Sequence, residues 1–201
     1  MSDTAYCYPP NYKVLKNKAD IREQDALDRF ERRMTFLRLQ ESIPSGDFDL
    51  PHLQAIHRHI FQDVYDWAGQ LRSVEINKGS SQFQFRQYIE TGMADVHRRI
   101  QSHNYLKNLS KHDFADLAGE IMGDVNYVHP FREGNGRTQM QYLKQLTEQA
   151  GHSIDLTKID RDAWMLASKR AHQGDYQTMA RCIGGAIKNQ RDRDRSQPRR
   201  R

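Results

Sequence analysis

Residues 129–137 read His129-Pro130-Phe131-Arg132-Glu133-Gly134-Asn135-Gly136-Arg137. Because Pro130 disfavours a helical conformation at His129, we predict that one helix ends here and that another begins after Gly136. The stretch brings together a base, a carboxylate, a flexible turn and a cation. Taken singly, each feature has a plainer explanation: a helix C-cap for His129, an ordinary turn for the glycines, and an exposed ion pair for Glu133 with Arg137.

Taken together, the glycines and the two charged residues fit phosphate binding. Glycine at 134 and 136 lets the backbone N–H groups of Gly134, Asn135 and Gly136 approach an anion, and the following helix adds its positive N-terminal end. Arg137, in the first helical turn, can contact phosphate oxygens with two N–H groups. Glu133 is a hard oxygen ligand of the kind that Mg²⁺ takes when it bridges two phosphates.

His129 completes the chemistry that this segment predicts. An imidazole titrates near neutral pH, so it can take the proton from an attacking hydroxyl at the edge of a phosphate site. We expect Phe131 to turn into the core and to anchor the loop. The residues therefore predict nucleotidyl or phosphoryl transfer without a covalent enzyme intermediate, driven by positioning and charge stabilisation.

The sequence around this loop predicts a series of helices with one hairpin. Apolar residues recur at helical spacing, and Asp20 with Glu23 and Ser110 with Asp113 have the spacing of helix caps. The predicted helices cover 20–41, 53–69, 89–100, 110–128, 137–150, 160–172 and 175–187. His57 and His59 are two residues apart and would point to different faces of their helix, so we expect them to have surface or capping roles rather than to bind a metal.

Between the second and third helices the apolar period changes from 3.6 to 2, which predicts a β-hairpin over 73–85. Its alternating apolar residues are Val74, Ile76, Phe83 and Phe85. Its turn consists of Lys78, Gly79, Ser80 and Ser81. A lone hairpin is marginal in water, so it must lean on the helices or receive a further strand along its free edge. Periodicity alone leaves a plain surface connection and a peptide-docking role equally open.

Composition sets the broad class of the protein. With 201 residues and 37% hydrophobic content, we expect one domain with one sizeable core. No long apolar run and no basic-then-apolar N-terminus occur, so we expect a soluble cytosolic protein with no membrane contact. Cys7 and Cys182 have no spacing typical of a zinc site and read as two reduced thiols.

The basic character of the chain resides in its last segment. Residues 188–201 carry seven basic and two acidic side chains, a net charge of +5 that equals the value for the whole chain. We expect residues 188–201 to be a disordered basic tail. A solubilising end and a contact with nucleic acid or another polyanion are both compatible with it, and the first is the simpler interpretation.

From His129 to Arg137 the sequence resembles the Fic family, whose signature H-P-F-x-D/E-G-N-G-R it matches at all eight specified positions. The resemblance extends upstream through 56–72, which looks like the helix that precedes the flap in that family. It implies an all-α fold, a bundle of about seven to eight helices with one β-hairpin flap. It also implies a division into a helical extension at 1–40 packed on the core, a Fic domain at 41–187 and the tail at 188–201.

The resemblance implies a role for each residue of the loop and the flap. It implies His129 as general base, Glu133 as Mg²⁺ ligand and Arg137 as a phosphate contact, with ATP as the substrate. Asn135 with Gly134 and Gly136 would form the anion hole. The flap would align a target segment by strand addition, with Val74, Ile76, Lys78, Gly79 and Phe83 as its docking residues.

Two departures from the family pattern bear on regulation. The pattern has a second arginine three residues after the first, where this chain has Met140. The family's inhibitory motif, S/T-x-x-x-E-G/N, is missing from both flanks of the loop. The chain thus resembles the class that is inhibited by a separate antitoxin.

The resemblance implies a protein adenylyltransferase that moves AMP from ATP-Mg²⁺ to a Ser, Thr or Tyr hydroxyl of another protein. The expected setting is the bacterial cytoplasm, as the toxin of a toxin–antitoxin pair with type II topoisomerase subunits as targets; a secreted effector is the other setting considered. Some family members transfer a different phosphate-containing group, but phosphoryl-transferring members usually carry lysine at the position of Gly136. A rival of another class is a catalytically weak binding protein, in which Met140 reflects a decayed site and the basic tail binds nucleic acid or a partner.

Overall fold

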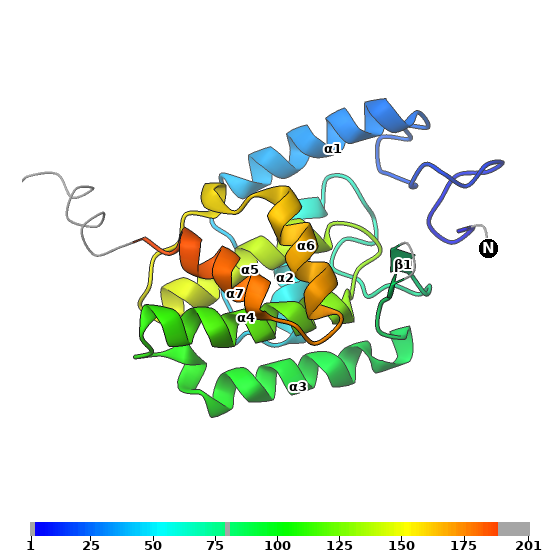
Figure 1. The fold of residues 1–201 in the computed structure, drawn as a ribbon. Helices are drawn as coiled ribbons and strands as arrows, with labels where there is room; N and C mark the ends of the chain where they lie inside the picture. The colour runs from blue at the N-terminus through cyan, green and yellow to red at the C-terminus, as the bar shows by residue number, and fades with distance from the viewer. Residues whose placement is uncertain (1–2, 79–80, 189–201) are drawn as a thin grey trace, which may run out of the picture. The chain divides into compact units, whose positions relative to one another are not determined.

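The computed structural model describes residues 3–78 and 81–188 (Figure 1). Its helices are α1 (Gln24–Leu39), α2 (Leu50–Phe61), α3 (Ile89–Ser102), α4 (Lys111–Val128), α5 (Asn135–Gln149), α6 (Arg161–Ala171) and α7 (Gln177–Ala186). Short 3-10 helices are η1 (Arg86–Tyr88), η2 (Asn104–Leu106) and η3 (Leu156–Lys158), and the strands are β1 (Asn77–Lys78) and β2 (Ser81–Gln82). The prediction of an all-α fold is confirmed.

The described residues divide into two compact units. One contains residues 3–94 together with 128–141, and the other contains residues 95–127 together with 142–188. The whole segment 129–137 and the flap that precedes α3 therefore belong to the first unit.

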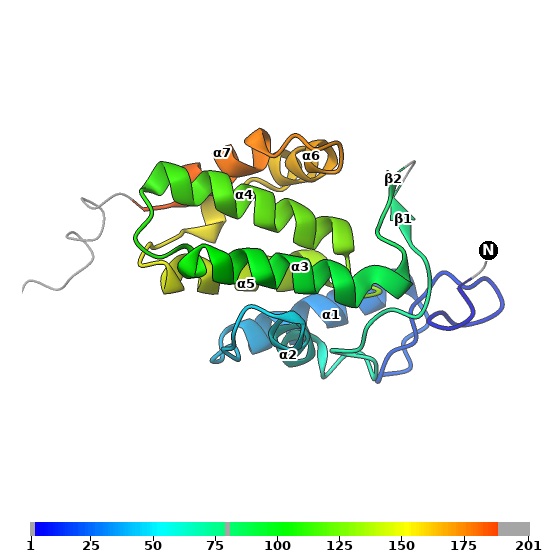
Figure 2. The same cartoon turned by 90° about the horizontal axis from the view of Figure 1, so that it is seen from below.

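In the first unit, α1 and α2 lie side by side (Figure 2). The Glu23 carboxylate caps α1 by accepting hydrogen bonds from the N–H groups of Asp25 and Ala26, and Asp49 caps α2 through His52. Carboxylates at these positions also complement the positive ends of the helices. Buried apolar side chains of this unit include Leu27, Leu53, Ile56, Ile60, Phe61, Val64, Ile89, Met93, Val128 and Phe131.

Two predicted helix ends in this unit are wrong. Asp20 does not cap α1, because its φ of +50° places it in a turn before the helix begins. The second helix ends at Phe61 instead of at Gly69. Val64 still continues the apolar face, since it is fully buried, but the N–H groups of Val64 and Tyr65 both bond to the Phe61 carbonyl in turns.

In the second unit, α6 packs against α7 (Figure 1). Ser110 caps α4 as predicted, because its Oγ accepts a hydrogen bond from the Asp113 N–H at 3.1 Å. The unit buries apolar side chains from each of its helices, among them Ile100, Phe114, Ile121, Val125, Leu143, Leu146, Trp164, Met179 and Ile183. No helix within residues 3–78 and 81–188 is long and apolar enough to span a membrane.

The predicted hairpin is present, but its paired part is short. β1 and β2 run antiparallel, with Asn77 opposite Gln82 and Lys78 opposite Ser81. Residues 73–76 and 83–85, which were predicted to pair as well, have no strand structure. Gly79 and Ser80 of the predicted turn lie outside the described residues, as do residues 189–201 of the predicted tail.

Candidate active site

The segment 129–137 connects α4 to α5. α4 ends at Val128, which agrees with the helix break predicted at Pro130, whereas α5 begins at Asn135, before the start predicted after Gly136. His129 adopts a left-handed backbone with φ of +46°, a conformation that costs energy for a residue with a Cβ atom. Because α5 begins within the segment, the first N–H groups of that helix, which have no intrahelical partners, lie at the end of the loop.

The imidazole of His129 lies against the flap. The Phe83 ring stacks on it with ring centroids 3.8 Å apart and an interplanar angle of 18°. Its backbone carbonyl accepts a hydrogen bond from Arg72 Nε at 2.9 Å. The residue as a whole is partly exposed.

Phe131 and Asn135 close the loop on itself. The Phe131 side chain is fully buried, as expected for an anchor. Asn135 bonds both polar groups of the Phe131 backbone: its Oδ1 accepts from the N–H at 3.0 Å, and its Nδ2 donates to the carbonyl at 2.8 Å. The Asn135 side chain thus holds the loop, and its backbone N–H remains as the candidate anion donor.

The sequence-based expectation of a surface or capping role for His57 is wrong. Its side chain is fully buried and stacks on Phe131, with ring centroids 3.9 Å apart. Its Nδ1 accepts from the Gly69 N–H at 2.8 Å, so Nε2 carries the proton and donates to the Glu133 carbonyl at 2.9 Å. Burial lowers the pKa of His57 to about 4, which keeps the ring neutral.

Gly134 is required at its position for two reasons. Its φ is +85°, and a Cβ atom there would lie 2.3 Å from Cζ of Phe61. Its N–H donates to Oε1 of Glu133 at 2.9 Å. A carboxylate oxygen therefore already occupies the position at which this amide would bind a phosphate oxygen. By contrast, a Cβ atom at Gly136 would meet no atom within 4 Å.

Arg137 extends from the first turn of α5 toward α1. Its Nη2 donates to Oε1 of Glu31 at 2.6 Å, and its Nη1 donates to Oγ1 of Thr35 at 3.4 Å. The guanidinium lies over the Phe61 ring, 4.6 Å from its centroid. Nη2 is also 3.8 Å from Oε1 of Glu133, so the two charged residues predicted for phosphate and metal binding are neighbours.

Sequence reasoning missed Glu31. Its side chain is only 15% exposed and accepts hydrogen bonds from Arg137 and from the buried Tyr65 hydroxyl. Burial, followed by the Glu31 charge and hydrogen bond, raises the pKa of Tyr65 above its usual range, so Tyr65 stays a donor. The residues are far apart in the chain, and a glutamate on a helix rich in charged residues has no distinguishing pattern.

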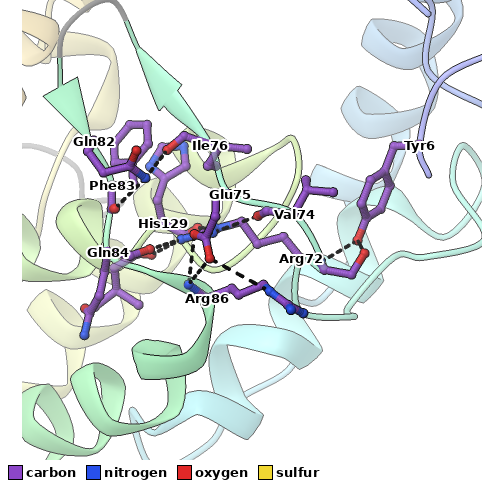
Figure 3. A network of polar contacts seen from close by, with 12 residues as sticks. Tyr6, Arg72, Val74, Glu75, Ile76, Gln82, Phe83, Gln84, Arg86 and His129 are labelled. Carbon is purple, nitrogen blue, oxygen red and sulfur yellow. Dashed lines mark hydrogen bonds and ion pairs between the residues drawn. The ribbon is translucent and has the colours of Figure 1, made fainter. Parts of the chain in front are cut away.

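The flap residues predicted to dock a target occupy different environments (Figure 3). Phe83 is buried against His129, whereas Val74 and Ile76 are partly exposed. The Ile76 carbonyl accepts hydrogen bonds from the Phe83 N–H at 3.3 Å and from Gln82 Nε2 at 3.1 Å. Lys78 lies in β1, and Gly79 is outside the described residues.

The single carboxylate of the loop, Glu133, could hold Mg²⁺ only together with oxygens of a bound nucleotide and water. Among residues 3–78 and 81–188, no group of three or more His, Cys, Asp or Glu side chains could hold a metal ion. Glu133 is 48% exposed and adjacent to Arg137, so it can turn toward a metal–phosphate complex. Mg²⁺ in phosphate sites commonly takes one or two carboxylates, with phosphate oxygens and water completing its shell. The donor set fits that arrangement.

The chain is similar in sequence to a known protein family and to individual members of it. Residues 47–146 match the model of the Fic/DOC family. The chain is 41% identical to "Probable protein adenylyltransferase y4lH" of Sinorhizobium fredii, over 87% of the chain and 91% of the relative. It is 35% identical to "Probable protein adenylyltransferase Fic" of Escherichia coli, over 85% of each.

A solved structure has the same fold. The N-terminal Fic domain of a VirB-translocated Bep effector protein from Bartonella quintana, crystallised with bound ADP, superimposes with a TM-score of 0.83. The match covers 96% of this chain and 98% of that chain at 25% identity.

Proposed function

The chain belongs to the Fic/DOC family, and from this premise we propose that it is a protein adenylyltransferase that uses ATP-Mg²⁺. Its relatives over most of the chain carry that name, and a structural neighbour binds ADP. The observation that supports the proposal most strongly is the Gly134 N–H, which holds a carboxylate oxygen at 2.9 Å at the start of α5. An amide that binds one anionic oxygen is directed to bind another.

In the proposed reaction, the target hydroxyl loses its proton to His129 as its oxygen attacks the α-phosphorus of ATP. The bond from that phosphorus to the bridging oxygen breaks, and pyrophosphate leaves. The product is an AMP ester of the target side chain. No enzyme nucleophile takes part, so positioning and charge stabilisation account for the acceleration.

The remaining residues of the loop stabilise the phosphates in this proposal. The N–H groups of Gly134, Asn135 and Gly136 bind phosphate oxygens, and Arg137 contributes its charge. Glu133 would hold Mg²⁺, since its half-exposed side chain is free to leave the Gly134 N–H. Bound Mg²⁺ would neutralise phosphate charge and assist the departure of pyrophosphate.

The flap binds the second substrate, the target protein, in this proposal. The free edge of the hairpin can accept an extended target segment by strand addition. The docking residues in this proposal are Val74, Ile76, Lys78 and Phe83, with Gly79, which lies outside the described residues. The Phe83 ring on His129 links the docking residues to the base. A hydroxyl carried by the docked segment would then lie close to the imidazole.

ATP labelled on the α-phosphate or on the γ-phosphate separates the proposed reaction from its alternative. Each would be incubated with the protein, Mg²⁺ and a bacterial lysate. AMP transfer predicts a labelled protein band from the α-label alone. A band from the γ-label would indicate phosphoryl transfer, and no band from either would contradict both.

The biological setting is part of the proposal. We place the protein in the bacterial cytoplasm as the toxin of a toxin–antitoxin pair, with type II topoisomerase subunits as the first targets to test. A separate antitoxin would supply the inhibitory glutamate. Mass spectrometry of the labelled bands identifies the target, and bands that contain no topoisomerase subunit would remove that assignment.

A further inference from the structure

Arg72 joins the flap to the backbone of the loop that carries His129 (Figure 3). Its side chain is fully buried. Nε of the guanidinium donates to the His129 carbonyl at 2.9 Å. Nη1 donates to the Val74 carbonyl at 2.9 Å and to Oε2 of Glu75 at 3.3 Å. Nη2 donates to the Gln84 carbonyl, and to the Val128 carbonyl at 3.4 Å.

These bonds use the full capacity of the side chain. A guanidinium has five N–H donors in a rigid plane, and each of them has an acceptor here. In addition, the backbone N–H of Arg72 donates to the Pro130 carbonyl at 2.9 Å. One residue therefore binds three consecutive carbonyls of the loop, at 128, 129 and 130, together with both stems of the flap, at 74 and 84.

The burial of this cation is costly, which argues against a role in packing alone. Glu75 is its only carboxylate partner among the bonds above, and that side chain is 42% exposed. Replacing a buried ion pair by apolar residues of similar volume is often neutral or stabilising. The contribution of Arg72 therefore comes from the backbone carbonyl groups to which it donates hydrogen bonds.

The backbone of His129 needs such support. A non-glycine residue with φ of +46° persists only where surrounding contacts over-determine its conformation. Arg72 bonds the carbonyl of His129 and the carbonyls of both its neighbours. The Gln84 carbonyl that it also holds follows directly after Phe83, whose ring lies on the imidazole.

We propose that Arg72 is a positioning residue for AMP transfer, which holds the flap and the backbone of His129 in one fixed arrangement. A target segment on the flap then presents its hydroxyl to an imidazole whose location is set by the same side chain. The inference rests on the proposed function. It assigns Arg72 no contact with the nucleotide, the metal or the reacting atoms.

The first test is Arg72→Lys in the full chain. Lysine keeps the charge, but its three donors sit on one flexible atom and cannot reproduce a planar fork. Displacement of a reacting group by about 1 Å can cost on the order of 10²-fold in rate, so we expect kcat to fall by that order. The KM for ATP and the thermal stabilisation by ATP-Mg²⁺ should stay within about twofold, since the bonds of Arg72 reach residues 128–130 and none of Gly134, Asn135 and Gly136.

Arg22→Lys is the matched control, because that arginine is 63% exposed and lies outside the site. It should have wild-type kcat and KM. A folded Arg72→Lys protein with wild-type kcat would overturn the proposal. So would an equal effect on ATP binding and on turnover, which would indicate general loss of structure.

A second variant decides the matter if Arg72→Lys does not fold. Glu75→Gln removes the carboxylate partner of Arg72 from a half-exposed position, so the fold should persist. Glutamine can still accept a hydrogen bond but lacks the charge, so the weakened arrangement should lower kcat by about three- to tenfold without changing the KM for ATP. Unchanged kcat in this variant would contradict the proposal.

Amide hydrogen exchange tests the same inference without a measurement of enzyme activity. In Arg72→Lys, or in Glu75→Gln to a lesser degree, exchange should increase together in 73–78, 81–85 and 128–131, while α5 beyond Thr138 keeps wild-type protection. An increase confined to the flap would show that the two segments are not held jointly. A wild-type protein that fails to transfer AMP would contradict the proposed function, whereas the exchange result would still decide the role of Arg72.

Discussion

The Phe83 ring lies flat on the imidazole of His129, with ring centroids 3.8 Å apart and planes inclined by 18°. This contact joins a residue predicted to dock a target to the residue predicted to be the base. It covers one face of the imidazole with an aromatic ring of the flap. The position of the base therefore depends on the flap as well as on the loop.

Phe83→Ala should lower the rate of AMP transfer by about 2–10-fold, because an aromatic contact of this kind contributes about 0.5–1.5 kcal/mol beyond buried area. The effect should appear in kcat at saturating ATP. Phe85→Ala is the control, since that ring is 53% exposed. If the two alanine variants have equal rates, the stack has no part in orienting His129.

The two glycines of the loop should respond differently to alanine. Gly134→Ala brings a Cβ atom to 2.3 Å from the Phe61 ring at a φ of +85°, so it should lower the free energy of unfolding by about 1–3 kcal/mol. Gly136→Ala meets no atom within 4 Å and should leave stability within about 0.5 kcal/mol. Its methyl group should nevertheless reduce the increase in the free energy of unfolding that ATP-Mg²⁺ produces, if phosphate approaches that backbone. Urea unfolding with and without ATP-Mg²⁺ measures both effects, and full stabilisation of Gly136→Ala by nucleotide would argue against the assigned anion site.

Glu31→Ala should destabilise the protein by about 2 kcal/mol, because it leaves the Arg137 guanidinium and the buried Tyr65 hydroxyl without their shared acceptor. Adding Tyr65→Phe to this variant should cost less than it does in the wild type, since the lost partner is the same. Asp28→Ala, one turn away on the exposed side of α1, serves as the control. Additive effects of Glu31→Ala and Tyr65→Phe on urea unfolding would show that the two groups act independently.

His57 should make stability depend on pH. Its pKa in the folded protein, about 4, is below the ordinary value of 6.5, so between these values the unfolded chain binds a proton that the folded chain does not. The free energy of unfolding therefore falls as the pH is lowered from 6.5 toward 4, by about 3 kcal/mol at most. The dependence should be weaker in His57→Gln and unchanged in His112→Gln, whose imidazole is 83% exposed. Identical pH slopes for wild type and His57→Gln would contradict the buried neutral ring.

The loop and most helices could be predicted because their signals are local. Pro130 marks the end of α4, Ser110 caps its start, and apolar residues at helical spacing identify α3. The end of α2 could not be predicted in this way. Val64 continues the apolar period beyond Phe61, and periodicity does not distinguish a buried turn from a buried helix.

The residues that sequence reasoning missed act through long-range contacts. Arg72 is the last residue of the stretch 56–72 that resembles the family, and Glu31 is one of many charged residues on its helix. His57 was expected on the surface, although its ring fills the space between Phe131 and the Glu133 carbonyl. Each of these roles depends on a partner more than 50 residues away in the chain, for which a single sequence has no local signal.

The central claim is that His129 is the base for AMP transfer, and His129→Ala tests it most directly. The variant and the wild type would be incubated with α-labelled ATP, Mg²⁺ and lysate, after thermal shift has verified that both still bind ATP-Mg²⁺. The account predicts a labelled protein band with the wild type and none with the variant. Equal labelling by the two proteins would contradict it.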